Sequence, residues 1–200
     1  MDLKINPQEI ITIQGARILF PSHYEMLRSV MPERYQVACD ALLMTGMRPV
    51  EFERMQPDWY RGPLRIVKLP DGACLKQKCE YKARTVKLSL PGCDAVDRYL
   101  HYEGKPAPAP SSSKVAFRDG LRRYADAAGI GTEGITTKML RKTWCSWLTA
   151  CFPERMAYIQ ASMGHNSDTI AQHYLGLVFP EFEIEEKMRK VYMVGWGGGF

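Results

Sequence analysis

The sequence lacks any hydrophobic run that approaches the ~18 residues of a membrane-spanning helix. Its amino terminus, MDLKINPQEI, has acidic and polar residues where a signal peptide needs an apolar segment. The six cysteines form no CxxC pair and have no histidine at the spacing of a zinc site. We therefore expect an intracellular protein with reduced structural thiols, no metal and no other cofactor.

The composition is that of an ordinary globular protein, with 46% hydrophobic and 24% charged residues in a chain of 200. This length allows one good-sized core. The 27 Lys and Arg residues exceed the 22 Asp and Glu residues, which gives a net charge of +5. Such a charge is compatible with a nucleic-acid partner, but many enzymes also carry it, so the placement of the charge matters more than its sum.

Helical patterns occupy both ends of the chain, and a short β region lies between them. The β region runs from Leu64 to Leu90, where LRIVKLP, GACLKQK and RTVKLSL predict three antiparallel strands separated by turn residues. The segment KPAPAPSSSK predicts an exposed loop. The predicted fold class is therefore α+β, mostly α-helical, with a small three-stranded antiparallel sheet. Helices are expected at residues 22–30 with Ser22 as cap, 32–46, 93–104, 115–129, 137–150, 153–164 and 181–193, with a short one ending near Tyr174.

The stretch LLMTGMRPVEFERM places an arginine between two helices. Gly46 ends the first helix, and Pro49 opens the second while it forces Arg48 into an extended conformation. At such a helix start, the guanidinium and the backbone N–H groups can point at one anion, with Glu51 holding the arginine. The alternative is a surface arginine paired with an ordinary first-turn acid.

The stretch TTKMLRKTWCSWL predicts a second basic helix start. If Thr137 caps this helix, Lys138 and Arg141 share a face of its first turn, above an apolar stripe that contains Trp144 and Trp147. Two cations at the positive end of a helix favour a bound anion. The alternative is a solvated basic turn above a buried tryptophan pair.

The third stretch, MGHNSDTIAQHYLG, sets Tyr174 nine positions after His165. Together the three stretches supply two arginines, a lysine, a histidine and a tyrosine. Exchange of a phosphodiester by a tyrosine needs cations on the non-bridging oxygens, a proton acceptor for the phenol and a proton donor for the departing 5′ oxygen. The covalent phosphotyrosine keeps the energy of the broken bond, so the reaction requires no ATP.

These three stretches resemble, in order, the signature boxes of the catalytic domain of tyrosine recombinases, the phage-type integrase family. TGMRPVE resembles the first arginine box, KMLRKTW the second and MGHNSDTIAQHYLG the third, and the resemblance covers roughly residues 20 to 190. It implies that Tyr174 is the nucleophile, that Arg48 and Arg141 hold the scissile phosphate, and that Glu51 supports Arg48. It also implies that His165 supports the phosphate or assists proton transfer.

Two positions need a choice within this resemblance. The second box usually has a histidine where this chain has Lys138, which can bind a phosphate oxygen but is a poor proton acceptor unless its pKa is lowered. The family also has a catalytic lysine on a β-hairpin, for which Lys76, Lys78 and Lys82 are the candidates. We choose Lys78, because it lies nearest the expected turn, and assign it the protonation of the 5′ oxygen.

The resemblance implies double-stranded DNA as the partner, other copies of the chain assembled on that DNA in a tetrameric synapse, and no membrane. We expect a short extension over residues 1–20 and a catalytic domain over residues 21–200, without the family's amino-terminal core-binding domain. Alternatives are a type IB topoisomerase and a DNA-binding accessory protein of the same fold. The family docks its carboxy-terminal helix on a neighbouring protomer, while the alternative is packing on its own domain; candidate contacts are Phe182, Ile184, Met188 and Val191.

Overall fold

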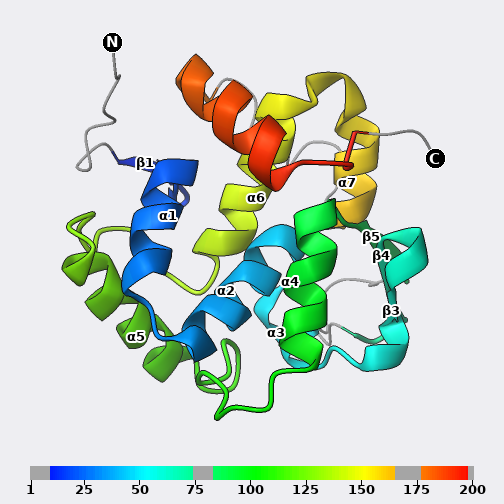
Figure 1. The fold of residues 1–200 in the computed structure, drawn as a ribbon, viewed down its shortest axis with the longest axis horizontal. Helices are drawn as coiled ribbons and strands as arrows, with labels where there is room; N and C mark the ends of the chain where they lie inside the picture. Colours follow the sequence, from blue (N-terminus) through cyan, green and yellow to red (C-terminus); the bar gives the residue numbers. More distant parts are fainter. Residues whose placement is uncertain (1–9, 74–82, 165–176, 198–200) are drawn as a thin grey trace.

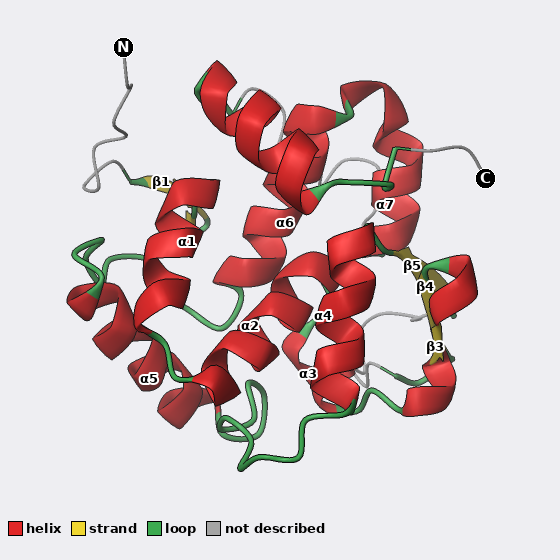
Figure 2. Ribbon diagram, in the orientation of Figure 1, coloured by secondary structure: helices red, strands yellow, loops and turns green. Residues whose placement is uncertain are grey.

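The computed structural model describes residues 10–73, 83–164 and 177–197 (Figure 1). Helices make up most of this described part of the chain, and the strands lie in two small sheets (Figure 2). The α-helices are α1 (Pro21–Val30), α2 (Glu33–Thr45), α3 (Pro49–Glu53), α4 (Leu90–Leu100), α5 (Lys114–Ala127), α6 (Met139–Cys151) and α7 (Met156–Met163), followed by a π-helix, η4 (Glu183–Tyr192). Short 3₁₀ turns are η1 (Pro57–Trp59), η2 (Gly62–Leu64) and η3 (Pro153–Arg155). The mostly helical class with a small antiparallel sheet is confirmed.

The larger sheet has the order β3 (Tyr60–Arg61), β4 (Ile66–Leu69) and β5 (Arg84–Lys87), and both pairs are antiparallel. Strands β4 and β5 correspond to the expected strands LRIVKLP and RTVKLSL. The expected middle strand, GACLKQK, falls almost entirely outside the described residues. The third described strand is instead β3, which the sequence pattern did not indicate because its two residues are too few to show an alternation.

Helix α2 lies at the centre of the molecule, with α4 and α6 packed against it (Figure 1). Its last nine residues, from Val37 to Thr45, are all buried, which explains why it shows little one-sided patterning. On α6, Trp144 and Trp147 are fully buried and pack edge to face, as the sequence predicts. The core therefore holds the end of α2 and the start of α6 in fixed relative positions.

An amino-terminal hairpin, formed by β1 (Ile11–Ile13) and β2 (Ala16–Ile18), covers one side of α6. Arg17 is completely buried there and donates a hydrogen bond to the carbonyl of Ile130. Lys142 of α6 donates to the carbonyl of Ile13 at 2.6 Å. The hairpin is thus fastened to the helix that carries Arg141.

The carboxy-terminal part of the chain packs on its own domain. Helix η4 lies against α1 and α6, and its Met188 is fully buried, whereas Phe182 and Val191 are exposed. After it, Trp196 is buried and donates from Nε1 to the carbonyl of Lys87 at 3.2 Å. The sequence left open whether this helix docks on a neighbouring protomer or packs on its own domain. Met188 packs on its own domain.

The start of α1 differs from the sequence prediction. The helix begins at Pro21, and Ser22 does not cap it; its backbone N–H donates to the Glu183 carboxylate at 3.2 Å. A buried acid on η4 therefore does the work expected of a local hydroxyl. Since this partner is 161 positions away, no local pattern could indicate it.

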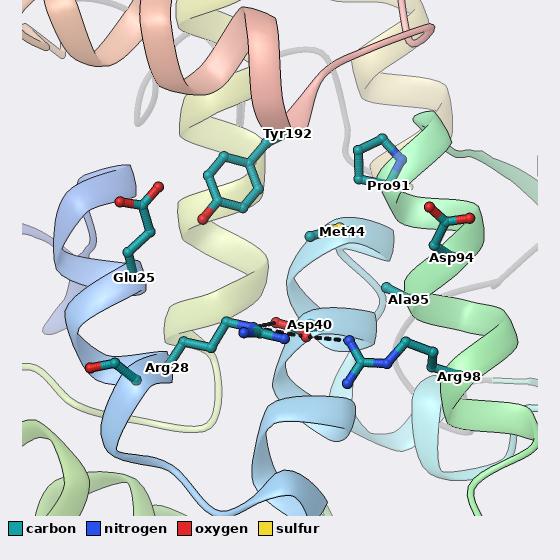
Figure 3. A pocket seen from close by; sticks show the side chains of 10 residues that line it. Glu25, Arg28, Asp40, Met44, Pro91, Asp94, Ala95, Arg98 and Tyr192 are labelled. Carbon is teal, nitrogen blue, oxygen red and sulfur yellow. Dashed lines mark hydrogen bonds and ion pairs between the residues drawn. The ribbon is translucent and has the colours of Figure 1, made fainter.

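A charged network joins α1, α2 and α4 around the carboxylate of Asp40 (Figure 3). The buried Asp40 carboxylate accepts from Tyr24 Oη at 2.6 Å, from Arg28 Nε at 3.0 Å and from Arg98 Nη1 at 3.4 Å. Asp40, Arg28 and Arg98 line one end of a pocket of about 380 Å³, and Tyr192 of η4 also lines it. The network fixes α1 and α4 to the central helix.

Within the residues described, no helix is both long enough and apolar enough to cross a membrane.

Candidate active site

The junction between α2 and α3 positions Arg48 as the sequence predicts. Gly46 ends α2 in the left-handed conformation, with φ of 58°. A side chain on this residue would also meet the indole of Trp144 at 2.7 Å, so the turn requires glycine for two reasons. Arg48 is extended, with φ of −67° and ψ of 146°, and Pro49 is the first residue of α3. Helix α3 has only five residues, so the positive charge here comes from side chains rather than from a helix dipole.

Glu51 is the buried centre of the site. Its side chain is 0% exposed, although α3 is a short surface helix. Its Oε2 accepts from the backbone N–H of Arg48 at 2.7 Å, and its Oε1 accepts from Arg48 Nη1 at 2.9 Å. The predicted support of Arg48 by Glu51 is therefore present, but as a buried charge-assisted contact rather than as a surface pair.

Arg84, at the start of β5, is a member of this cluster that the sequence interpretation missed. Its Nη1 and Nη2 donate to the two oxygens of Glu51, each at 2.6 Å, so the pair is bidentate. A weak signal was present in the sequence. In a strand, alternate residues share a face, and Arg84 lies two positions before the buried Val86. A cation on the buried face of a strand requires a buried anion.

Arg141 enters the site from α6 and is only 8% exposed. It donates from Nη1 to the carbonyl of Gly46 at 2.6 Å and from Nη2 to the carbonyl of Met163. Burial, together with the nearby charges of Arg48 and Arg84, lowers its pKa to about 10. The alternative was a solvated basic turn above a buried tryptophan pair. The tryptophans are buried, but Arg141 is buried as well, so the solvated turn is wrong for Arg141.

The carboxy-terminal end of α7 holds all three arginines. The carbonyl of Ser162 accepts from Arg84 Nε at 3.1 Å, the carbonyl of Met163 accepts from Arg141, and the carbonyl of Gly164 accepts from Arg48 Nη2 at 3.0 Å. The last carbonyls of a helix have no partner within the helix and form its negative end. Three successive carbonyls therefore orient three cations, which come from the residue before α3, from β5 and from α6.

The described cluster carries a positive excess. Arg48, Arg84 and Arg141 contribute three positive charges against the single negative charge of Glu51, and the backbone carbonyls orient the guanidinium groups without neutralising them. Burial would raise the pKa of Glu51, but hydrogen bonds and charge from Arg84, the Arg48 N–H group and the charge of Arg141 outweigh it and lower the pKa to about 2. The site is thus suited to bind an anion.

The other predicted site residues lie at the edge of this cluster or outside the described residues. Lys138 is exposed at the residue before α6, which begins at Met139, so the predicted cap at Thr137 is wrong by one position. Thr137 is itself buried. Gly164 ends α7 in the left-handed conformation, with φ of 60°. Outside the described residues lie His165, Tyr174, and the three hairpin candidates Lys76, Lys78 and Lys82.

No group of three or more potential metal ligands occurs in the described part of the chain. The four cysteines described there are unpaired thiols, and burial raises the pKa values of Cys39, Cys145 and Cys151. The described cluster can bind and orient an anion through its guanidinium groups.

Solved structures of tyrosine recombinases and integrases have a similar fold. The Tn1549 transposon integrase in complex with circular intermediate DNA gives a TM-score of 0.64 at 15% identity, over 90% of this chain and 66% of that chain. The XerA recombinase gives 0.59 at 18% identity, over 84% and 63%. A lambda integrase dimer bound to a core site gives 0.62 at 16% identity, over 88% and 65%.

No family model and no curated protein matches the sequence. This chain spans 66%, 63% and 65% of the three solved chains, slightly less than two thirds of each. At such low identities the likeness concerns the fold. Its mostly helical architecture and small antiparallel sheet are those of the tyrosine recombinase catalytic domain.

Proposed function

We propose that the chain is the catalytic domain of a site-specific DNA recombinase or integrase that cleaves and rejoins strands through a 3′-phosphotyrosine intermediate. The observation that carries the proposal is the cluster of Arg48, Arg84 and Arg141 around the buried Glu51, with its formal excess of two positive charges. Two of the carbonyls that hold this cluster belong to Met163 and Gly164, the first two residues of the segment that resembles the third box of the family.

In the proposed reaction, Arg48 and Arg141 bind the non-bridging oxygens of the scissile phosphate. Their guanidinium groups are fixed by Glu51 and by the carbonyls of Gly46, Met163 and Gly164, so little reorganisation accompanies the build-up of charge in the transition state. Lys138, exposed at the start of α6, is assigned a third contact to the phosphate. These cations stabilise the pentacoordinate phosphorus and leave proton transfer to other groups.

The nucleophile and the proton donors are assigned from the sequence resemblance. Tyr174 attacks phosphorus as its phenolic proton passes to water, directly or with the help of His165, and the bond from phosphorus to the 5′ oxygen breaks. Lys78 gives a proton to that oxygen, and His165 assists the transfer or contacts the phosphate. A later attack by a 5′ hydroxyl reverses these steps and releases the tyrosine, so the reaction needs no external energy.

The proposed partner is double-stranded DNA that contains a recombination site, with further copies of the chain assembled on it. The solved structures described above include an integrase in complex with DNA and a dimer bound to a core site, which supports DNA as the partner. A tetrameric synapse is part of the proposal.

The test is to trap a covalent protein–DNA adduct on a library of nicked suicide substrates. Wild-type protein is expected to form an adduct that maps to Tyr174, while Tyr174→Phe forms none and keeps its DNA affinity within a few-fold, because phosphate contacts dominate affinity. An adduct at Tyr192 would contradict the assignment. Supercoil relaxation without joining of two sites would indicate a topoisomerase, and DNA binding without any adduct would indicate an accessory protein.

A further inference from the structure

We propose that Arg84 is a positioning residue of this active site, which keeps Glu51 ionised and thereby holds Arg48 in place for the scissile phosphate. The inference rests on the proposed function and adds to it a residue that the three signature boxes do not contain. Arg84 does not bind the phosphate in this proposal. Its role is carried out through the buried carboxylate and through the end of α7.

The geometry of the pair favours Arg84 as the main partner of Glu51. Arg84 contacts both oxygens at 2.6 Å, whereas the side chain of Arg48 reaches one oxygen at 2.9 Å. The side chain of Arg84 is 11% exposed and that of Glu51 is 0% exposed, so water cannot replace this contact. A bidentate pair of this kind also fixes the plane of the carboxylate.

The charge of Glu51 depends on this contact. Among the described residues, the charged groups that face Glu51 are Arg48, Arg84 from β5 and Arg141 from α6. Burial raises the pKa of the carboxyl, and Arg84 is the largest influence that lowers it. Without Arg84, burial acts against fewer opposing contacts, and Glu51 takes up a proton at a higher pH.

Protonation of Glu51 would release Arg48. An ionised carboxylate accepts from both the backbone N–H and the Nη1 of Arg48, as it does here. A neutral carboxyl carries a donor on one oxygen, and this O–H group would face the N–H donors of an arginine. Arg48 would then lose the contact that sets the direction of its guanidinium group.

Arg84 also connects the sheet to α7. Its Nε donates to the carbonyl of Ser162 at 3.1 Å, and the Ser162 hydroxyl accepts from the backbone N–H of Lys87 at 3.2 Å. The next two carbonyls of the same turn hold Arg141 and Arg48. Arg84 therefore acts on the phosphate-binding arginines by two routes, through Glu51 and through the backbone of α7.

The experiment compares single-turnover cleavage of a trapped suicide substrate from pH 5 to pH 9 for wild type, Arg84→Gln and Arg84→Lys. Arg84→Gln is expected to lose on the order of 10² in rate at pH 7, as small displacements of catalytic groups commonly do. Part of that loss is recovered as the pH rises, because Glu51 ionises again. Arg84→Lys keeps a positive charge beside Glu51. We therefore expect a smaller loss of cleavage rate, and the same dependence of the rate on pH at the acidic end of the range as in wild type.

Arg28→Gln is the matched control, because Arg28 is also an arginine bound to a buried carboxylate, that of Asp40, in the separate network of Figure 3. It is expected to lower stability and to leave the shape of the pH profile unchanged. An equal loss of rate for Arg84→Gln at every pH would overturn the proposal. The same shifted profile in Arg28→Gln would also overturn it, since the effect would then be one of general stability.

A second measurement separates this proposal from the proposed function. Urea unfolding of Arg84→Gln, Glu51→Gln and the double variant forms a cycle that requires no DNA. If Arg84 acts on Glu51, the double variant is more stable than the sum of the single effects predicts. Additive effects would overturn the role of Arg84 even in a chain that cleaves DNA. If the two effects are coupled but the wild-type chain forms no covalent adduct with DNA, the recombinase function is rejected and the role of Arg84 stands.

Discussion

Replacement of Glu51 by glutamine is expected to destabilise the fold in a way that depends on pH. The pKa of Glu51 falls from a reference value of 4.5 to about 2 in the folded protein. This difference of about 2.5 units corresponds to about 3 kcal/mol of stability at pH 7. Glutamine has the shape of the protonated acid but no charge, so Glu51→Gln should lose a stabilisation of about that size.

The sign of the pH dependence follows from the lowered pKa. A carboxyl group whose pKa is lower in the folded state contributes its full stability above the pKa of the unfolded chain, and this contribution is lost as the pH falls toward the folded value. With values of 4.5 and about 2, the contribution drops from about 3 kcal/mol at pH 7 to about 1 kcal/mol at pH 3. The difference in the free energy of unfolding between wild type and Glu51→Gln should therefore shrink by about 2 kcal/mol between pH 7 and pH 3.

The assay is urea unfolding followed by circular dichroism at pH 7, 5, 4 and 3. Glu103→Gln is the control, because Glu103 is an exposed acid of the same type, and it should unfold as wild type does at each pH. A gap between wild type and Glu51→Gln that is the same at pH 7 and pH 3 would refute the reasoning, since it would mean that Glu51 stabilises the fold by packing rather than by its charge.

Three further outcomes are expected. Gly46→Ala should lower stability by about 1–3 kcal/mol in thermal unfolding, more than Gly15→Ala, because both residues have positive φ but only at Gly46 would the new methyl group meet Trp144; equal losses would contradict this. Lys138→Arg should keep substantial cleavage and Lys138→Ala should lose about 10² to 10³ in rate, whereas an inactive arginine variant beside an active histidine variant would point to proton transfer. Because Trp196 is buried in its own chain, sedimentation without DNA should show weak self-association, and a stable tetramer would contradict it.

Local rules predicted the parts of the site that adjacent residues determine. The end of α2 at Gly46, the extended Arg48 and the start of α3 at Pro49 follow from the conformations that glycine and proline allow. The contact between Arg48 and Glu51 follows from a spacing of three residues in a first helical turn. For these features the sequence-based expectation and the structure agree.

Contacts between distant segments could not be predicted in the same way. Arg84 binds Glu51 across 33 positions, and Ser22 binds Glu183 across 161 positions. Each pair unites elements that are adjacent only after the chain has folded. Alternation with Val86 places Arg84 on the buried face of its strand but does not identify its partner, and this is why the role of Arg84 was missed.

The three carbonyls at the end of α7 make the length of that helix a determinant of the site. Each residue of an α-helix turns the backbone by about 100°, with a rise of about 1.5 Å. Insertion or deletion of one residue between Met156 and Ala161 would therefore rotate all three carbonyl acceptors away from the arginines that they bind. Side-chain replacements leave these backbone acceptors in place. Substitutions on the exposed side of α7 should thus be tolerated far better than a change of register, which would dismantle the arginine cluster in a single step.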